Sequence, residues 1–426
     1  MNERQPLEGI QIVEMTLAVQ GPAAGVFLRD MGAEIVKVEP PLGDPSRYGR
    51  NVDNPTPEGT LGPQFVAVNR GKRSVCLDAT TELGREALER LLARADVFCS
   101  NYRTQALEAL GLDYETLHAR YPRLVYATVN GFGPGGPDAD KAMLDGAAVA
   151  RGGLASITGQ PDGLPGLPGS IVADTTGAMQ FALGIVTALL ARERHGVGQR
   201  VQTSGLGGQL WLQQWELTHT AMTGTRLQRA GSHHPNIRGP YGIYQTRDGG
   251  AIMLAHTMQQ DAWDAICAFG EEPELSFDPR WSTPGARLGE GRTETDSNDV
   301  RAALKRAFGR KTTSEWEAFL RTQPEAIFER VRTHHEVLDD PQNAANQYIT
   351  EIEVPDFGRA QTVGNLVQLS ETPGSVKGGP PLLGEANQEV LQQLGFAPEQ
   401  VAAITDAAIA QREAALAELL AAATAD

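Results

Sequence analysis

The sequence has 426 residues, enough for roughly two or three domains. Its 37 basic and 53 acidic residues give a formal net charge of −16, which excludes the strongly basic balance typical of nucleic-acid-binding proteins. With 41% hydrophobic and 21% charged residues, the composition is that of a globular protein and not of a disordered chain.

The first 130 residues alternate between two patterns. Short apolar, β-branched runs predict strands, and segments with apolar residues three and four positions apart predict helices. This alternation indicates parallel βαβ units in a doubly wound sheet. Strands are expected at residues 10–15, 34–39, 96–100 and 124–129, and helices at about 22–31 and 83–95.

The middle of the chain contains a Gly/Pro-rich loop at 161–170 and then a long helix at 175–194, which has a basic end and Gly196 as its cap. The composition changes after Thr225, where a hairpin and helices predict a smaller α+β domain at 235–335. Other helices are expected at 206–222, 259–269, 299–308, 314–321, 385–394 and 398–422, and other strands at 241–246, 251–255, 350–354 and 361–367.

Three features of the sequence bear on location. The cysteines Cys76, Cys99 and Cys267 lie far apart, which excludes a disulfide scaffold and fits a reducing cytoplasm. The first residues lack a basic segment followed by an apolar core, so we expect no secretory signal. The longest apolar stretch, 181–191, is too short to cross a bilayer. We therefore expect a cytoplasmic protein that contacts neither membrane nor nucleic acid.

Gly131-Phe-Gly133-Pro-Gly-Gly136 matches the spacing of dinucleotide-binding loops and follows a predicted strand. In such a loop the third glycine opens a helix that holds the pyrophosphate. Here Pro134 and Pro137 interrupt the motif, and the next helix starts later. We expect a Gly/Pro turn, and a nicotinamide-dependent dehydrogenase is kept as a third alternative. Adjacent histidines occur at 233–234 and 334–335, but neighbouring side chains point apart, so we expect no metal site.

Asp174 stands between the Gly/Pro loop and a helix predicted to open with Thr175. Aspartate is a favoured N-cap residue, which would explain it structurally. A carboxylate at a helix start is also ionised and oriented, which suits a nucleophile that attacks an acyl group. The position alone leaves both interpretations open.

Basic residues gather in two segments near predicted strand ends, 43–47 and 69–73. The carboxyl ends of strands in such sheets bind phosphate-bearing ligands, and Arg and Lys pair well with phosphate. The segments therefore predict either a site for an anionic ligand or a solvated charged loop.

Further motifs follow in order along most of the chain, most densely in residues 7–203 and more thinly between 225 and 370. They are Leu7-Glu-Gly-Ile, Gly21-Pro22, Met31-Gly-Ala-Glu-Ile-Val-Lys-Val-Glu-Pro40, Gly43-Asp-Pro-Ser-Arg47, Asn69-Arg-Gly-Lys-Arg-Ser74, Ala95-Asp-Val97, Asn101-Tyr102, Pro122-Arg-Leu-Val125, Gly131-Phe-Gly133, Gly136-Pro137, Gly196-Val-Gly-Gln199 and Pro381-Leu-Leu-Gly-Glu385. With these motifs the sequence resembles the class III (CaiB/BaiF-type) CoA-transferase family, which includes formyl-CoA transferase.

The resemblance implies an α/β fold in two domains. A Rossmann-like, CoA-binding large domain with a mostly parallel sheet is expected from residues 1–225 and 340–426, and a small α+β domain from 235–335. The resemblance also implies a homodimer in which two ring-like chains interlock.

The same resemblance implies that Asp174 is the catalytic nucleophile. CoA would move from an acyl-CoA thioester to a free carboxylic acid through an aspartyl-CoA thioester. CoA and acyl-CoA would be substrates, and no permanently bound cofactor or metal is expected. The other site residues carried over by match are Leu17, Ala18, Lys72, Arg73, Asn101 and Tyr102, with Arg47 as a phosphate partner and Asp145 at an acidic position.

Departures from formyl-CoA transferase leave the substrates open. That enzyme has a glutamine at the position of Val19, whereas Gln20 comes one residue later here, and Leu144 replaces an expected tyrosine. The glycine-run loop that covers its active site is absent between 205 and 260. A larger or more apolar acyl group would suit these changes. The second alternative is a 2-methylacyl-CoA racemase, which would lack a proton carrier at Leu144; an isomerase or a CoA-dependent lyase of the same fold would keep the aspartate.

Overall fold

The computed structural model describes residues 4–49, 60–257, 259–324 and 326–425. The chain divides into two compact units. Unit 1 comprises Met1–Gly152, Ser170–Leu212 and Asp340–Asp426, and unit 2 comprises Gly153–Gly169 and Gln213–Asp339. Compared with the domain ranges expected from the sequence, residues 153–169 and 213–225 fall in unit 2.

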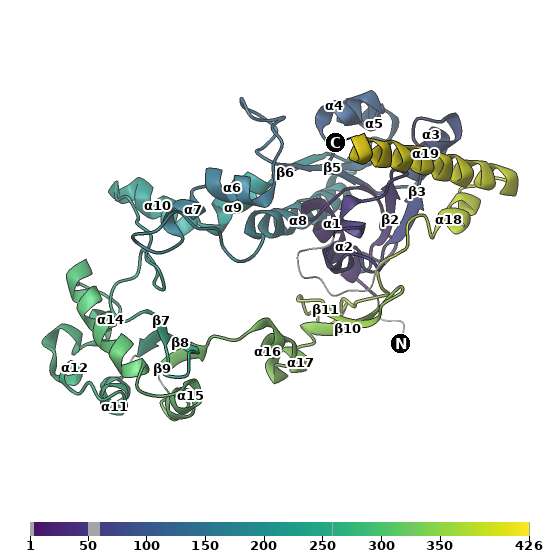
Figure 1. Cartoon of the computed structure of the whole chain (residues 1–426). Coiled ribbons are helices and arrows are strands. Elements are labelled where there is room, and N and C mark those ends of the chain that lie inside the picture. Colours follow the sequence, from purple (N-terminus) through teal and green to yellow (C-terminus); the bar gives the residue numbers. More distant parts are fainter. Residues whose placement is uncertain (1–3, 50–59, 258, 325, 426) are drawn as a thin grey trace. The chain divides into compact units, whose positions relative to one another are not determined.

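Unit 1 is built on a six-stranded parallel sheet with helices on both faces, which confirms the predicted α/β class (Figure 1). Its strands, in sheet order, are β3 (Arg73–Cys76), β2 (Glu34–Glu39), β1 (Gln11–Met15), β4 (Val97–Ser100), β5 (Val125–Asn130) and β6 (Arg200–Ser204). In β1, Val13 and Met15 pack into the core on one face and Ile12 into the core on the other, as the alternation of a strand requires. The edge strands β3 and β6 were not predicted, because each is short and partly polar.

Several helices of unit 1 bury apolar side chains against the two faces of this sheet. The helices are α1 (Gln20–Asp30), α2 (Pro63–Asn69), α3 (Glu82–Leu92), α4 (Thr104–Ala109), α5 (Tyr114–Arg120), α6 (Asp145–Arg151), α8 (Val172–His195), α9 (Gly205–Leu212), α17 (Pro341–Ala345), α18 (Asn387–Gln393) and α19 (Pro398–Ala425), with a 3-10 turn at Pro45–Arg47. Side chains of α3, α4, α5, α18 and α19 share a core with Val13, whereas α1 and α8 share the other core with Ile12. The sheet is therefore doubly wound.

The long helix α8 packs on the same face of the sheet as α1. Phe181 and Ile185 are fully buried, and the helix ends at Gly196, whose φ of 80° and N–H bond to Arg192 confirm the predicted cap. By length and composition α8 could also cross a bilayer, which corrects the expectation that no segment is long enough. The core helix of a globular protein meets the same criterion, and 44% of its most apolar window is buried inside the fold.

The helix predicted over residues 206–222 is two helices. α9 ends at Leu212, Gln213 leaves the helical region with φ −115° and ψ 32°, and α10 (Gln214–Thr223) begins anew. The break contains neither Gly nor Pro, so the local sequence does not predict it. It coincides with the passage from unit 1 to unit 2.

Unit 2 combines a three-stranded antiparallel sheet with short helices around a core that contains Trp263, Trp281 and Trp316. The hairpin of β7 (Gly242–Gln245) and β8 (Ala251–Thr257) confirms its prediction, and β9 (Ala326–Arg330) adds a strand that was not predicted. The helices are α7 (Leu154–Ile157), α10, α11 (Gln260–Phe269), α12 (Glu274–Phe277), α13 (Pro284–Arg287), α14 (Glu294–Phe308), α15 (Thr313–Leu320) and α16 (His334–Leu338), with a 3-10 turn at Pro279–Trp281.

The C-terminal part of the chain belongs to unit 1. After the hairpin of β10 (Ile349–Val354) and β11 (Gly358–Val363), the chain runs beside β3. There the Asn387 side chain accepts a hydrogen bond from Cys76 N (2.8 Å) and donates one to Cys76 O (3.1 Å). Unit 1 is thus assembled from both ends of the sequence.

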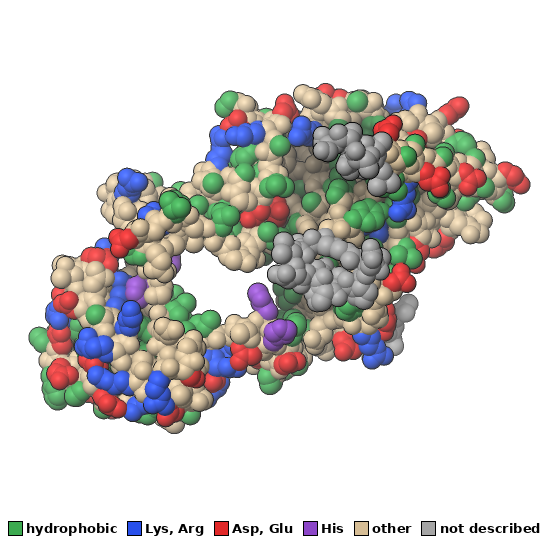
Figure 2. Space-filling model, viewed as in Figure 1, with side chains coloured by type: hydrophobic (Ala, Val, Ile, Leu, Met, Phe, Trp, Pro, Cys, Tyr) green, Lys and Arg blue, Asp and Glu red, His purple; other side chains and the backbone are tan. Residues whose placement is uncertain are grey.

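Charges are mixed on the surface. Figure 2 shows acidic and basic side chains interspersed over the visible face of both units. Ion pairs near the surface include Arg90–Glu86 in unit 1 and Arg321–Glu317 in unit 2. On the face shown, positive charge is not gathered into the stripe that a nucleic-acid backbone would need.

Candidate active site

A cavity of about 510 Å³ lies within unit 1, beyond the carboxyl ends of β1, β4 and β5. Its walls are formed by segments that follow these strands, within 17–20, 101–104 and 130–144, by residues of β5, β6, α4 and the start of α5, and by Asp174 of α8. β1 and β4 are neighbours, and the strand order reverses between them. Open α/β sheets bind their ligands at such a switch point, and the volume is within the usual range for ligand pockets.

Residues that the sequence assigned to the site converge on this cavity from separate elements. Leu17 and Ala18 come from the turn after β1, Asn101 and Tyr102 follow β4, and Asp174 comes from α8. All five line the cavity. The site therefore contains a candidate nucleophile close to the loops expected to bind CoA.

Asp174 is the third residue of α8, and its side chain lines the cavity. Burial and the negative charge of Asp145 raise its pKa to about 6. The carboxylate is partly desolvated and more basic than an ordinary aspartate. Both properties favour attack on an acyl carbon.

The start of α8 is capped by Asp145 and not by Asp174. Oδ1 of Asp145 accepts hydrogen bonds from Ala173 N (2.7 Å) and Asp174 N (3.0 Å). Because the helix begins at Val172, the interpretation of Asp174 as an N-cap was wrong. Asp145 itself does not line the cavity. It acts on Asp174 through the backbone hydrogen bonds that it accepts and through its own negative charge.

Three cations expected to bind the ligand lie outside the cavity. The Arg47 side chain is 1% exposed and pairs with Glu39, and the Lys72 side chain is fully buried with Nζ 2.8 Å from Glu14 Oε1. Burial lowers the pKa of Lys72 to about 8. Arg73 is one-third exposed and pairs with acidic residues elsewhere in unit 1. A phosphate could reach Arg47 or Lys72 only if their buried ion pairs broke, so the structure gives both a role inside the fold.

The cavity has cations of its own, which the sequence analysis missed. They are Arg103, Lys141 and Arg200. Arg103 directly follows Asn101-Tyr102, and Lys141 lies between the Gly/Pro motif and Leu144. These neighbours could have pointed to both residues, but nothing local singles out Arg200, which begins an unpredicted strand.

Gln20 also lines the cavity, and its side-chain nitrogen is buried with no hydrogen-bond partner among the described residues. The residue is 6% exposed. Its amide packs against α8 one turn beyond Asp174, where a Cβ added at Gly177 would lie 2.2 Å from Gln20 Nε2. An unpaired buried donor carries a desolvation cost of about 1–3 kcal/mol, so this one needs an explanation in function or in bound solvent.

The Gly/Pro motif at 131–136 forms a loop, as expected. No helix opens at its third glycine; α6 begins only at Asp145. Gly133 and Gly136 have φ of 104° and 92°, a left-handed conformation that favours glycine. The loop therefore lacks the helix start that a nicotinamide pyrophosphate would require.

Both histidine pairs lie in unit 2. Within the described residues, no group of three or more His, Cys, Asp or Glu side chains is arranged to hold a metal ion. In unit 2, His234 lies 3.2 Å from Glu216 and stacks on Trp215. Burial and the charge of Arg301 lower the pKa of His233 to about 4.

Comparisons with known proteins bear on the whole chain. The profile of CoA-transferase family III matches residues 7–387. The chain is 34% identical over 392 residues to a succinyl-CoA–D-citramalate CoA-transferase of Chloroflexus aurantiacus, covering 92% of this chain and 94% of the relative. It is 31% identical over 420 residues to a formyl-CoA:oxalate CoA-transferase of Streptomyces avermitilis, covering 93% and 97%.

A solved structure agrees with this relationship. The fold is similar to that of a CaiB/BaiF family protein from Brucella suis, with a TM-score of 0.79 and 29% identity over 92% of this chain and all of that chain. The resemblance expected from the motifs is confirmed. The chain belongs to CoA-transferase family III, and it is an enzyme of the CoA-transferase class.

Proposed function

We propose that the protein moves CoA from an acyl-CoA thioester to a free carboxylic acid through an aspartyl-CoA thioester on Asp174. The observation that carries this proposal is the position of Asp174, which lines the cavity from the start of α8, where Asp145 caps the helix; its raised pKa fits this position. A partly desolvated carboxylate in a cavity at the switch point of an α/β sheet is suited to covalent acyl chemistry.

In the proposed reaction the Asp174 carboxylate and the CoA thiolate alternately attack acyl carbons. A carboxylate oxygen of Asp174 attacks the thioester carbon, the C–S bond breaks, and the CoA thiolate leaves a mixed anhydride. The thiolate then attacks the aspartyl carbonyl carbon and releases the first acid as its carboxylate. The acceptor carboxylate repeats both steps in reverse, and no net proton or electron is transferred.

The unpaired amide of Gln20 supports a role in stabilising these intermediates. Each attack places negative charge on a carbonyl oxygen, which needs a donor already aimed at it. The side-chain nitrogen of Gln20 is buried one helical turn from Asp174 and has no partner among the described residues. A donor that gains its partner only when the oxyanion forms would favour the transition state over the free enzyme.

We propose that CoA is bound by Leu17, Ala18, Asn101 and Tyr102, together with the cavity cations Arg103, Lys141 and Arg200. The first four are the family's CoA-binding positions as matched in this sequence. The three cations can pair with phosphate, although acidic residues such as Glu115, which pairs with Arg200, also line the cavity. Arg47, Lys72 and Arg73 are not included, because none of them lines the cavity. CoA enters and leaves as substrate, and the proposal includes no permanently bound cofactor.

The alternatives are less well supported. A racemase would need a second proton carrier, and no histidine is among the described residues that line the cavity. A lyase or isomerase would keep Asp174 but would need no acceptor acid. The deciding experiment incubates the protein with succinyl-CoA or formyl-CoA and a panel of acids that includes citramalate, mesaconate and oxalate. Mixed CoA products detected by mass spectrometry support transfer; turnover without an acceptor acid would contradict it.

We also propose a homodimer, of the interlocked type that the family resemblance implies. Its support is an exposed apolar row on α8, spaced at three and four residues, which a second copy would cover. The row is Met179, Leu183, Val186 and Leu190, exposed by 58%, 66%, 40% and 53%. A cytoplasmic location is proposed as well, supported by three free, buried cysteines.

A further inference from the structure

The turn after β1 has an uncommon backbone conformation and forms part of the cavity wall. Ala18 has a φ of 63°, in the left-handed region that disfavours residues with a Cβ. Both Leu17 and Ala18 line the cavity. Something outside the turn must therefore hold it in this shape.

Asn101 holds the first half of the turn. Its Oδ1 accepts a hydrogen bond from Leu17 N, and its Nδ2 donates one to Leu17 O, each at 2.8 Å. The amide is thus engaged on both sides by a single backbone residue. Asn101 also lines the cavity, and its Oδ1 and Nδ2 can each form one further hydrogen bond.

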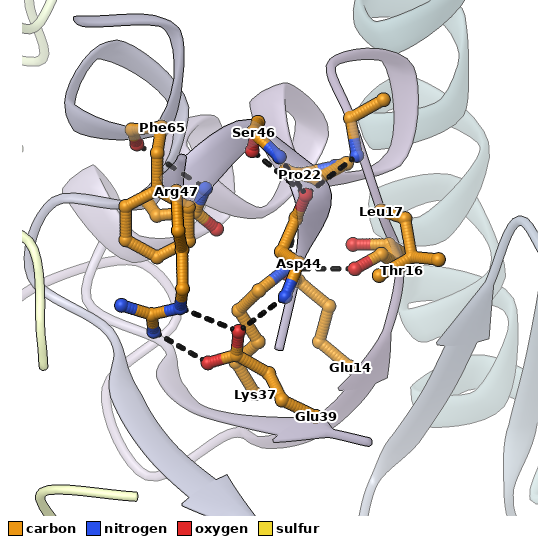
Figure 3. A network of polar contacts seen from close by, with 12 residues as sticks. Glu14, Thr16, Leu17, Pro22, Lys37, Glu39, Asp44, Ser46, Arg47 and Phe65 are labelled. Carbon is orange, nitrogen blue, oxygen red and sulfur yellow. Dashed lines mark hydrogen bonds and ion pairs between the residues drawn. The ribbon is translucent and has the colours of Figure 1, made fainter. Parts of the chain in front are cut away.

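Asp44 and Lys37 hold the rest of the turn from below. Asp44 Oδ1 accepts a hydrogen bond from Ala18 N (3.2 Å), and Lys37 Nζ donates to Thr16 O (2.7 Å). The two side chains pair with each other, with Lys37 Nζ 3.1 Å from Asp44 Oδ2, and both are fully buried (Figure 3). Neither lines the cavity.

Asp44 is itself fixed by its neighbours. Ser46 donates to Asp44 Oδ1 from both its backbone N (3.0 Å) and its hydroxyl (2.7 Å), and Asp44 N donates to Glu39 Oε2 (3.0 Å). Burial alone would raise the pKa of Asp44, but the charge of Lys37 and the hydrogen bonds from Ser46 and Ala18 hold it below its ordinary value. The carboxylate is ionised and is bound by Ser46, Ala18 N and Lys37.

These groups belong to a buried, charge-balanced cluster. Its carboxylates are Glu14, Glu39 and Asp44, and its cations are Lys37, Arg47 and Lys72. Each side chain is at most 1% exposed. Buried ion pairs seldom stabilise a fold more than well-packed apolar side chains would, so their presence here is better explained by the geometry they impose on the turn.

We infer that Asp44 is a positioning residue for acyl-CoA binding. It acts through Ala18 N–H and Lys37 to keep the Leu17–Ala18 turn in the left-handed shape that faces the cavity, and it does not touch the ligand. This inference rests on the proposed function, in which that turn contacts CoA. It assigns a role in CoA affinity to a residue that is buried outside the binding cavity.

The test uses Asp44→Ala, which removes the acceptor of Ala18 N–H. The Kd of CoA, measured by calorimetry, and the KM for acyl-CoA should each rise about tenfold, as for loss of one well-placed interaction. The KM for the acceptor acid and kcat should stay within about twofold. Asp44→Asn keeps the size and one acceptor oxygen, so it should weaken CoA binding less; it also serves as the test variant if Asp44→Ala does not fold.

A rescue and a control separate positioning from simple loss of stability. Glycine adopts a left-handed φ freely, so Ala18→Gly added to Asp44→Ala should recover about half of the lost affinity on a logarithmic scale. The control is Asp30→Asn, which removes another buried charge in unit 1, paired with Arg70 and outside the cavity. It should lower the unfolding temperature and leave the Kd of CoA unchanged.

The outcomes distinguish this inference from the proposed function. If the wild-type protein neither binds CoA nor transfers it, the proposed function fails. If the wild type does both and a folded Asp44 variant binds CoA as well as wild type, the positioning role alone is overturned. Absence of any rescue by Ala18→Gly would also overturn it, because the effect would then not pass through the turn.

Discussion

Asp145 and Asp174 are 29 residues apart in the sequence, yet one oxygen of Asp145 accepts hydrogen bonds from the backbone N–H of both Ala173 and Asp174. The Asp145 carboxylate thereby caps α8 and fixes the backbone at Asp174. Its charge also adds to burial in raising the pKa of Asp174 to about 6. The two acidic residues thus differ in role: Asp145 caps the helix and raises the pKa of its neighbour, and Asp174 lines the cavity.

The pH dependence of turnover should report this arrangement. Asp174 must be ionised to attack, so kcat/KM for acyl-CoA should fall as the pH drops through about 6 and reach a plateau near neutral pH. Asp145→Asn removes the charge but keeps an oxygen that can cap the helix, so the midpoint should move down by about 1 pH unit. Initial rates between pH 4.5 and 8 measure both curves; identical midpoints would show that Asp145 does not set the pKa.

Replacing Asp174 should separate activity from stability. Asp174→Asn should lower transfer by about a thousandfold or more, because no side chain remains to carry the acyl group. The raised pKa means that the folded state disfavours the charge of Asp174. Near neutral pH the free energy of unfolding of Asp174→Asn should therefore be about 1–2 kcal/mol higher than that of wild type, after a discount for partial exposure.

Kinetics and denaturant unfolding check the two parts of this prediction. The matched control is Asp406→Asn, an exposed carboxylate on α19 that should change neither quantity. Peptide mapping of wild-type enzyme quenched during turnover should find CoA on residue 174. Modification of a different side chain would contradict the proposed mechanism.

Gln20→Leu should reduce kcat by about a hundredfold, the usual effect of losing an oxyanion donor, with little change in the KM for acyl-CoA. Gln209→Leu is the control, because Gln209 is fully buried and both its side-chain polar atoms lack hydrogen-bond partners among the described residues, but it does not line the cavity. That variant should keep kcat. Equal losses in both variants would indicate a packing effect and not catalysis.

Lys141→Met should raise the KM for acyl-CoA about tenfold and weaken its dependence on salt, because one phosphate contact is lost. Lys377→Met removes an exposed cation of the same unit outside this cavity and should change neither quantity. Steady-state kinetics at two ionic strengths supply the measurement. An unchanged KM would remove Lys141 from the proposed CoA site.

Leu183→Asp places a charge in the apolar row of α8, where the side chain is 66% exposed. If a second copy covers this row, the charge should dissociate the dimer, since burying an unpaired carboxylate is costly. Light scattering should give half the wild-type mass. Leu416→Asp on α19, where the side chain is 43% exposed, should leave the mass unchanged. A Leu183→Asp dimer as stable as wild type would place the interface elsewhere.

Local patterns in the sequence predicted much of unit 1. The apolar runs of β1 and β2, the long helix ending at Gly196 and the loop at 131–136 are all recognisable from neighbouring residues, because strand alternation and capping act over a few positions. Short edge strands such as β6 were missed because they carry little apolar signal. The family motifs added what local patterns could not, namely the prediction that Asp174 is the nucleophile of an acyl-transfer site.

By itself the sequence determined the alternation of strands and helices, the family and the candidate nucleophile. Only the tertiary structure decided which charges line the cavity. Arg47 and Lys72 look like phosphate-binding residues in the sequence but lie in a buried ion cluster, whereas Lys141 lines the cavity. The physical reason is that burial and pairing depend on residues far away along the chain, as when Asp145 caps α8, and no local pattern records those distances.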